Sequence, residues 1–266
     1  MIKQLRVEPG KPAGLAKRDS RETFGLSKED GEKRLADVHE RLAGLHDRLW
    51  AEARRSVLLV LQGLDASGKD GVIKRVFTGL NPQGCRVVSF KAPTATELAH
   101  DYLWRVHAAL PAHGEIGIFN RSHYEDIVAV RMHHIAPEKI WRKRADHIRE
   151  FERMLVDEGT AIVKIFLHVS KDEQRQRFQE RIDDPTKRWK FRKDDLQVHK
   201  RFDEYVQAYE EALTETSTDW APWYVVPADR NWLKSLAVAE LLVAELERLD
   251  PKYPEPEAGV EGLKIA

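Results

Sequence analysis

Three residues of the sequence, Gly63, Gly68 and Lys69, match the pattern G-x4-G-K. The match follows an apolar run at 57–61 and opens a helical pattern. Glycines let backbone N–H groups turn toward phosphate oxygens, a helix start adds roughly half a positive charge, and the lysine adds a full one. The alternative is a plain turn between strand and helix. We predict a phosphate-binding loop whose binding residues are Gly63, Ala66, Ser67, Gly68, Lys69 and Asp70.

Two carboxylates accompany this loop. Asp65 lies inside it, and Asp70 stands where such a loop normally carries Ser or Thr. An uncompensated carboxylate beside a bound phosphate would repel it by several kcal/mol, so we expect a cation between them. Mg²⁺, or Mn²⁺ in its place, is the natural candidate because it binds carboxylate and phosphate oxygens together. The structural alternatives are a turn-forming role for Asp65 and a favourable helix start at Asp70.

A second group of polar residues follows the apolar run at 116–119. It comprises Asn120, Arg121, Glu125 and Asp126. Arg121 could bind a phosphoryl oxygen with its planar guanidinium, Asn120 could assist it, and Glu125 or Asp126 could complete the metal site with Asp65. The sequence leaves open which of the two acids does so, and ion pairs that cap a helix are the structural alternative.

The third group is a basic segment at 175–195. Between Arg175 and Lys193 there are eight basic residues and three acids. Arg177 and Arg181 are four residues apart, so on a helix they share a face. A solvated charged face is one interpretation. The other is a mobile lid whose cations, which include Arg177, Arg181, Lys187 and Lys190, close over phosphates and exclude water.

The elements that must position these groups are short apolar runs separated by helical patterns. The runs cover 57–61, 86–90, 116–119, 161–169 and 223–226. Strands buried on both faces have this composition, and intervening helices make parallel crossovers the default. We therefore predict an α/β fold with a parallel five-stranded sheet, helices on both faces and ligands at the carboxyl ends of the strands.

Helix start signals support this interpretation. Ser27 offers a cap, and Leu35, Val38, Leu42, Leu45 and Leu49 then recur at the spacing of an amphipathic helix. Thr94 and Ser170 begin two further capping-box patterns. We expect residues 1–26 to run as an extended arm over the surface, 27–250 to form a single domain, and 251–266 to be a C-terminal tail.

Composition limits the classes of function. The 266 residues include 44 Lys and Arg and 44 Asp and Glu, so net charge gives no argument for a nucleic-acid or membrane partner. The single cysteine, Cys85, excludes an intrachain disulfide and fits a reducing compartment. We see no apolar run of the roughly 18 residues that a membrane helix needs and no secretion signal, and we expect a soluble, cytoplasmic protein.

Taken in order, four stretches of the chain resemble the family-2 polyphosphate kinases. They are "GLDASGKDG", "FNRSHYED", "RIDDPTKRWKF" and "APWYVVPAD", and the similarity spans roughly residues 27–250. The resemblance implies a P-loop-kinase fold with a helical lid, a homodimer or homotetramer, and magnesium-dependent phosphoryl transfer between inorganic polyphosphate and AMP, ADP or ATP. An ATP-dependent nucleotide or nucleoside kinase and a non-catalytic anion-binding switch are the rival interpretations.

The resemblance also assigns residues by position. Asp65, Lys69 and Asp70 match the family's first motif, Arg121 its second, and Arg177, Arg181, Lys187 and Lys190 its lid. One subgroup that prefers nucleoside diphosphates has D-R-S-W-Y-N-R in the second motif. This chain differs there at Asn120, His123, Glu125 and Asp126, and so resembles the subgroup that phosphorylates both AMP and ADP. Arg192 stands where the family pattern has Ser, which leaves the role of that position open.

Overall fold

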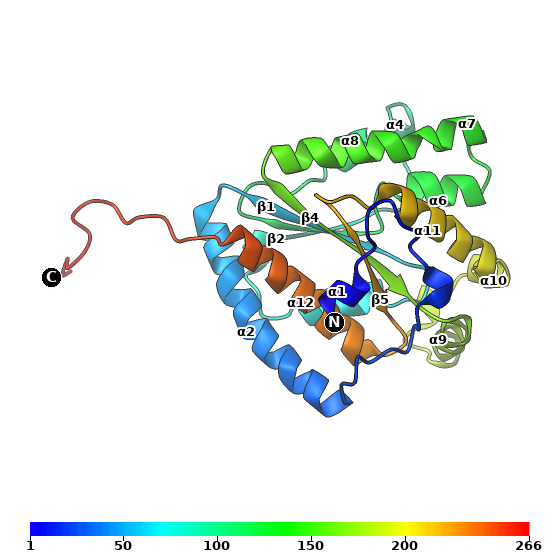
Figure 1. Cartoon of the computed structure of the whole chain (residues 1–266), viewed down its shortest axis with the longest axis horizontal. Helices are drawn as coiled ribbons and strands as arrows, with labels where there is room; N and C mark the ends of the chain where they lie inside the picture. The colour runs from blue at the N-terminus through cyan, green and yellow to red at the C-terminus, as the bar shows by residue number, and fades with distance from the viewer. Residues whose placement is uncertain (266) are drawn as a thin grey trace.

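The computed structural model describes residues 1–265, and a parallel five-stranded sheet lies at its centre (Figure 1). The strand order is β2-β3-β1-β4-β5. The bounds are β1 Ser56–Gln62, β2 Cys85–Ser89, β3 Ile116–Asn120, β4 Thr160–His168 and β5 Trp223–Pro227. All five predicted strands are confirmed to within one residue at each end. Leu58 pairs with Gly117 of β3 on one side and with Ile162 of β4 on the other, so β1 is central.

Helices cover both faces of the sheet. Their bounds are α1 Ile2–Leu5, α2 Lys28–Glu52, α3 Lys69–Val76, α4 Ala95–Leu98, α5 Trp104–His107, α6 Glu125–Met132, α7 Glu138–Trp141, α8 Lys143–Asp157, α9 Lys171–Asp183, α10 Lys193–Lys200, α11 Phe202–Thr216 and α12 Asn231–Leu249, with short 3-10 turns at Leu15–Lys17, Pro82–Gly84 and Arg188–Lys190. Helices α2 and α12 lie on one side of the sheet, and α6, α8 and α11 lie on the other (Figure 1). Because both faces are covered, every residue of β1 is buried.

The long helix α2 is formed as its sequence predicts. Ser27 caps it by accepting a hydrogen bond from the backbone N–H of Asp30 (3.0 Å). The five periodic apolar residues, Leu35, Val38, Leu42, Leu45 and Leu49, are all buried. They form the stripe through which α2 packs on the core, beside α12.

The N-terminal segment packs against the body of the molecule. Residues 2–5 form a helix, and the side chains of Leu5, Val7 and Leu15 belong to the hydrophobic core. The N–H of Val7 donates to the carbonyl of Trp223 (2.8 Å), so this segment lies along the outer edge of β5. The sequence concealed this packing because its few apolar residues follow no period.

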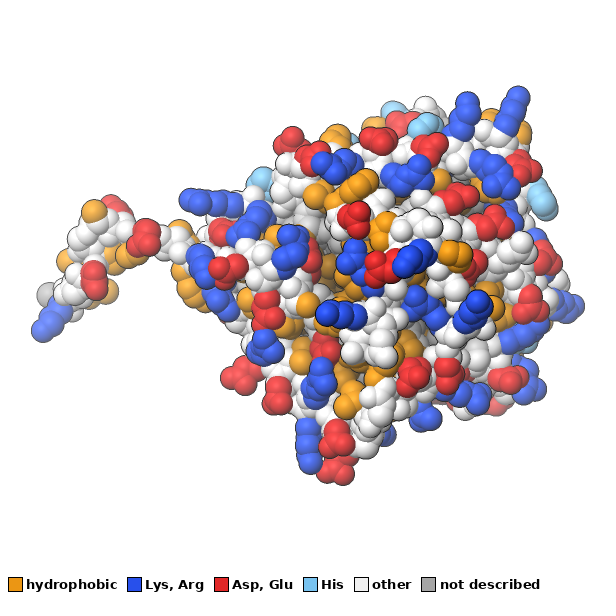
Figure 2. Space-filling view, in the orientation of Figure 1, with side chains coloured by type: hydrophobic (Ala, Val, Ile, Leu, Met, Phe, Trp, Pro, Cys, Tyr) orange, Lys and Arg blue, Asp and Glu red, His pale blue; other side chains and the backbone are white. Residues whose placement is uncertain are grey.

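The other end of the chain behaves differently. Residues 251–265 form neither helix nor strand and run away from the body of the molecule (Figures 1 and 2). On the face shown in Figure 2, acidic and basic side chains are interspersed, as expected for a chain without net charge. Across residues 1–265, every helix is too short or too polar to cross a lipid bilayer.

The contact between α2 and α12 generates a test with a built-in control. A Cβ atom on Gly31 would lie 2.3 Å from a ring carbon of Trp232, whereas a Cβ on Gly44 in the same helix would meet nothing within 4 Å. Replacing a helical glycine with alanine stabilises by about 1 kcal/mol when there is room, and overpacking costs about 1–3 kcal/mol. We expect Gly44→Ala to raise the free energy of unfolding and Gly31→Ala to lower it in urea titrations. Equal stabilisation by both changes would contradict the packing described.

Candidate active site

The phosphate-binding loop connects the end of β1 to the start of α3. Gly63 and Gly68 have φ angles of 150° and 99°, which side chains rarely adopt. A Cβ on Gly63 would also lie 2.8 Å from the carbonyl oxygen of Leu167, so backbone occupies that space. The Nζ of Lys69 reaches back over the loop and donates to the carbonyls of Gly63 (2.7 Å) and Leu64 (3.3 Å). The loop therefore has the compact form that the sequence predicts.

Opposing effects act on the pKa of Lys69. Burial, together with the nearby positive charge of Arg121, lowers the pKa of Lys69 to about 8. The carboxylates of Asp65, Glu125 and Asp70 act in the opposite direction. The amine is therefore protonated at neutral pH and loses its proton as the pH rises through about 8. Three acids thus lie near enough to favour the charged form of this lysine.

The second polar group meets the loop because β3 lies next to β1. Arg121 follows the last residue of β3 in a left-handed conformation (φ 62°), and its N–H donates to the carbonyl of Leu61 (3.0 Å). Its guanidinium forms ion pairs with Asp65 and, at 3.3 Å, with Glu125. The Nδ2 of Asn120 donates to Asp70 at 2.7 Å. Residues that are about 50 positions apart in the sequence thus form one cluster, as predicted.

Asp65 is the centre of this cluster. Burial by itself would raise the pKa of its carboxyl group, but the charges of Arg121 and Lys69 outweigh that effect and lower the pKa. Asp65 is therefore an anion at neutral pH. Its backbone carbonyl accepts a hydrogen bond from Gln174 (2.9 Å), whose side-chain oxygen lies 2.8 Å from Nδ1 of His199. Gln174 and His199 were not identified from the sequence.

The structure separates the two acids that the sequence left open. Glu125 contacts Arg121 beside Asp65, whereas the carboxylate of Asp126 lies 3.5 Å from Arg144 and 3.8 Å from Arg105. Burial raises the pKa of Asp126 while these two arginines lower it, and the net direction is upward. Asp126 therefore pairs with arginines other than Arg121, whereas Glu125 shares Arg121 with Asp65.

The cations of the basic segment at 175–195 lie in different surroundings. The charge of Arg181 acts on Asp65 and also on Asp195, a buried acid whose pKa is raised mainly by burial and which was not identified from the sequence. Lys187 instead pairs with Asp184 of the same segment (2.9 Å), and Lys190 lies over the ring of exposed Trp189. Arg181 thus lies near enough to act on the charge of Asp65, while the two lysines contact neighbours within the segment.

Arg177 differs most from its predicted role. Its Nε donates to Glu173 (2.8 Å), and its other four donors reach the carbonyls of Ala66, Ser67, Ala228 and Asp229 at 2.8–3.1 Å. All five N–H groups of the guanidinium are engaged by the protein. In this structure Arg177 therefore supports the loop from outside, instead of presenting donors to a phosphate.

Comparison with known proteins places this cluster in a family. The model of the family described as "Polyphosphate kinase 2 (PPK2)" matches residues 25–254. The chain belongs to the polyphosphate kinase 2 family. It is 52% identical to the AMP/ADP-polyphosphate phosphotransferase of Meiothermus ruber over 99% of this chain and 100% of that one. It is 46% identical to the ADP-polyphosphate phosphotransferase of Rhodopseudomonas palustris over 95% of this chain and 92% of that one.

Solved structures agree with this membership. The crystal structure of polyphosphate kinase 2 from Arthrobacter aurescens TC1 superposes with a TM-score of 0.93 at 40% identity, covering 97% of this chain and 93% of that one. A putative polyphosphate kinase 2 from Pseudomonas aeruginosa gives a TM-score of 0.83 at 32% identity, over 88% of this chain and 50% of that one. The P-loop-kinase-like fold implied by the resemblance is confirmed.

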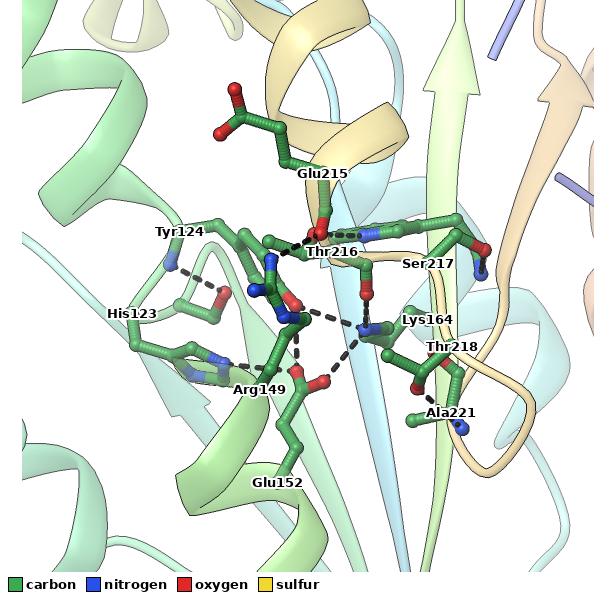
Figure 3. A network of polar contacts seen from close by, with 12 residues as sticks. His123, Tyr124, Arg149, Glu152, Lys164, Glu215, Thr216, Ser217, Thr218 and Ala221 are labelled. Carbon is green, nitrogen blue, oxygen red and sulfur yellow. Dashed lines mark hydrogen bonds and ion pairs between the residues drawn. The ribbon is translucent and has the colours of Figure 1, made fainter. Parts of the chain in front are cut away.

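In this polyphosphate kinase 2 chain, a buried polar network supports the second motif (Figure 3). Between Arg121 and Glu125, the side chains of Ser122, His123 and Tyr124 are all buried. The hydroxyl of Tyr124 donates to Glu152 (2.7 Å), and Nε2 of His123 lies 3.2 Å from the same oxygen. Arg121 and Glu125 therefore flank a segment of three residues whose buried side chains anchor the motif.

Lys164 completes this network from β4. Its Nζ donates to Glu152 (2.6 Å), to the hydroxyl of Tyr124 (3.0 Å) and to the carbonyl of Thr216 (2.7 Å) (Figure 3). Both partners of the ion pair are completely buried. Burial lowers the pKa of Lys164 against the effect of Glu152, whereas Lys164 and His123 outweigh burial and lower the pKa of Glu152. A lysine inside the apolar run "AIVKIFLHV" was the sequence signal that could have revealed this network.

The buried ion pair can be tested by removing one charge or both. Lys164→Met leaves an unpaired buried carboxylate, which typically costs about 3–5 kcal/mol, so we expect a large loss in the free energy of unfolding. Lys164→Met combined with Glu152→Gln should recover part of that loss in urea titrations. Lys33→Met, which removes the exposed pair of Lys33 with Glu29, is the control and should change little. A double variant no more stable than the single one would contradict this account.

Proposed function

We propose that this chain transfers the terminal phosphoryl group of inorganic polyphosphate to AMP or ADP, producing ADP or ATP. The observation that carries the proposal is the convergence of Lys69, Arg121 and Asp65 in a chain whose close relatives of matching length are named for this reaction. The relative from Meiothermus ruber is named for both AMP and ADP, and its similarity runs through the whole chain. The second motif, with Asn120 and Glu125, supports the same pair of acceptors.

The arrangement of charges suits phosphoryl transfer. In such reactions the protein contributes mainly positioning and electrostatic stabilisation of the transferring group. Lys69 and the N–H groups at the start of α3 would bind the donor, and Arg121 would orient the transferring or acceptor phosphate. Arg181 would add positive charge from α9. The exposed Lys187 and Lys190 would bind the polyanionic chain farther from the reacting group.

This chain's residues then need little covalent chemistry. The attacking group of AMP or ADP is a phosphate oxygen, which is already largely anionic near neutral pH because its second pKa is about 6. No general base is required to create the nucleophile. We therefore propose direct in-line displacement without a covalent protein intermediate, with Lys69, Arg121 and Arg181 opposing the negative charge that would otherwise keep donor and acceptor apart.

The acids fit a divalent cation shared with substrate. Asp65 is anionic and partly accessible, and Glu125 lies beside the same arginine. Within residues 1–265, no three His, Cys, Asp or Glu side chains form a metal-binding cluster. Water and phosphate oxygens would supply the remaining ligands of an ion held by two carboxylates. Mg²⁺ commonly binds in this way, and Mn²⁺ can replace it. Asp65 and Glu125 would hold the ion, which would neutralise phosphate charge when bound.

The same proposal includes the setting in which the enzyme works. We infer a cytoplasmic homodimer or homotetramer that acts on polyphosphate and nucleotides without a nucleic-acid or membrane partner. Equal numbers of acidic and basic residues support the absence of a nucleic-acid or membrane partner, because a chain without net charge has no general attraction to nucleic acid or anionic lipid.

The direct test supplies polyphosphate and Mg²⁺ with AMP or ADP in separate reactions, without ATP, and follows ADP and ATP formation. We expect both acceptors to be phosphorylated. Lys69→Ala and Arg121→Ala should fold normally and lose on the order of 10³-fold or more in turnover, because both lose a cation near the transferring group. Lys74→Ala, in the exposed part of α3, is the control. Transfer only when ATP is the donor would contradict the proposal.

The metal assignment is tested by two adjacent substitutions. Because Glu125 pairs with the same arginine as Asp65 whereas Asp126 pairs with two other arginines, Glu125→Gln should raise the Mg²⁺ concentration for half-maximal activity about tenfold, the usual effect of losing a ligand or its support. Asp126→Asn should keep the Mg²⁺ dependence of the unmodified enzyme, and EDTA should abolish turnover in both variants. If Asp126→Asn raised the Mg²⁺ concentration for half-maximal activity more than Glu125→Gln did, Asp126 and not Glu125 would be the metal ligand.

A further inference from the structure

A second buried cation lies under the phosphate-binding loop, and the activity described above does not account for it. Lys234 is on α12 and is almost completely buried. Its Nζ donates to the carbonyl of Ser67 (2.9 Å) and, more weakly, to that of Ala228 (3.4 Å). The guanidinium of Arg177 binds the same two carbonyls from α9. Two cations from two helices thus hold one peptide of the loop against the turn after β5.

The direction of that peptide has a consequence for phosphate. Every peptide bond described in the chain is trans, so the N–H of Gly68 points opposite to the carbonyl of Ser67. While Lys234 and Arg177 hold the carbonyl on their side, the N–H must face the other side of the loop. Gly68 precedes the first turn of α3, where N–H groups bind anions. The two cations therefore set the orientation of a phosphate-binding N–H without touching phosphate themselves.

Gly68 and Lys234 also depend on each other sterically. Gly68 has φ 99°, and a Cβ atom built on it would lie 2.1 Å from Nζ of Lys234. The amine occupies the space that any side chain at this position would fill. The second glycine of the loop is thus required both by its backbone conformation and by the lysine beneath it.

The surroundings of Lys234 couple it to charge in the loop. Burial and the nearby Arg177 lower its pKa to about 7, with a smaller contribution from Lys69. Glu173 of α9 and Asp229, just before α12, act in the opposite direction. These four groups, which lie on α3, on α9 and in the turn before α12, are the charges that act on the amine. An anion bound at the loop would favour the protonated amine, so phosphate binding and the charge of Lys234 should strengthen each other.

We propose that Lys234 is a positioning residue of the donor site: with Arg177 it fixes the peptide between Ser67 and Gly68 so that its N–H faces the polyphosphate. This inference rests on the proposed function for the identity of the donor. The contacts themselves do not depend on it, since any phosphate chain bound at this loop would meet the same N–H.

The experiment measures donor binding apart from turnover. Tripolyphosphate is titrated into the purified full-length protein by calorimetry, and the KM values for polyphosphate and for AMP or ADP are measured separately. Lys234→Met should fold, because an apolar side chain of similar length replaces a desolvated amine. We expect its Kd for tripolyphosphate and its KM for polyphosphate to rise roughly tenfold, while the KM for the nucleotide stays near its original value. Ser235→Ala, the next residue of α12, bonds only within its helix and is the matched control.

Two further readouts distinguish positioning from a merely structural role. Between about pH 6 and about pH 8.5, the unmodified protein should lose affinity for tripolyphosphate more steeply than Lys234→Met, because only the former releases a proton from this amine. Lys234→Gln keeps an N–H donor without a charge, so its affinity for tripolyphosphate should lie between those of the unmodified protein and Lys234→Met. It also replaces Lys234→Met in the experiment if the methionine variant does not fold.

Several results would overturn the inference. They are unchanged tripolyphosphate affinity in Lys234→Met or Lys234→Gln, a pH dependence identical to that of the unmodified protein, or equal increases in the KM for donor and nucleotide. Failure of the proposed function is separately visible, since the unmodified enzyme would then bind tripolyphosphate without transferring a phosphoryl group from polyphosphate to AMP or ADP.

Discussion

The ion pair between Arg121 and Asp65 is the interaction on which the candidate site depends. A site for a polyanion must gather positive charge, and Lys69, Arg121 and Arg181 would repel one another if no anions lay among them. Asp65 and Glu125 supply those anions, and burial strengthens the attraction by excluding water. The cluster is therefore nearly balanced before any substrate arrives. When a phosphate chain binds with its metal ion, the cations of the cluster can exchange carboxylate partners for phosphate, and the carboxylates can pair with the metal ion. No group of the cluster is then left with an uncompensated charge.

Holding these partners in place requires support from outside the two loops. The pair links the ends of β1 and β3, which are neighbours in the sheet, but neither loop is held by the sheet alone. Behind the β3 loop, Lys164 and Glu152 form a fully buried pair that anchors Tyr124 and His123. Behind the β1 loop, cations of α9 and α12 hold backbone carbonyls. Each loop thus has its own buried charged support, and both are anchored to elements from the second half of the chain.

The sequence predicted those parts of the arrangement that leave a pattern within a few neighbouring residues. The strands were recognisable because a buried parallel strand is a continuous apolar run, and the loop because its glycines and lysine lie within seven residues. That the loops of β1 and β3 meet followed from the rule that ligands bind at the carboxyl edge of the sheet.

The choice between Glu125 and Asp126 did not follow from the sequence, because adjacent residues of a helix point about 100° apart and the orientation of α6 is set by packing. Arg177 was placed on the right helix but its partners, about 50 and 110 residues distant, carry no local pattern. The burial of Leu5 and Val7 did not follow for the same reason, since contact with β5 and not any period of their own buries them.

The long separation between Ser67 and Lys234 has a consequence for biosynthesis. The two residues are 167 positions apart, and Lys234 lies near the end of the sequence. At ribosomal rates of about 5–20 residues per second, the lysine is added roughly 8–30 s after the glycine-rich loop. During that time the nascent chain lacks the lysine that locks this peptide of the loop. The loop therefore reaches its final form only once translation is almost complete, and an unfinished chain should hold a polyanion less tightly than the finished enzyme.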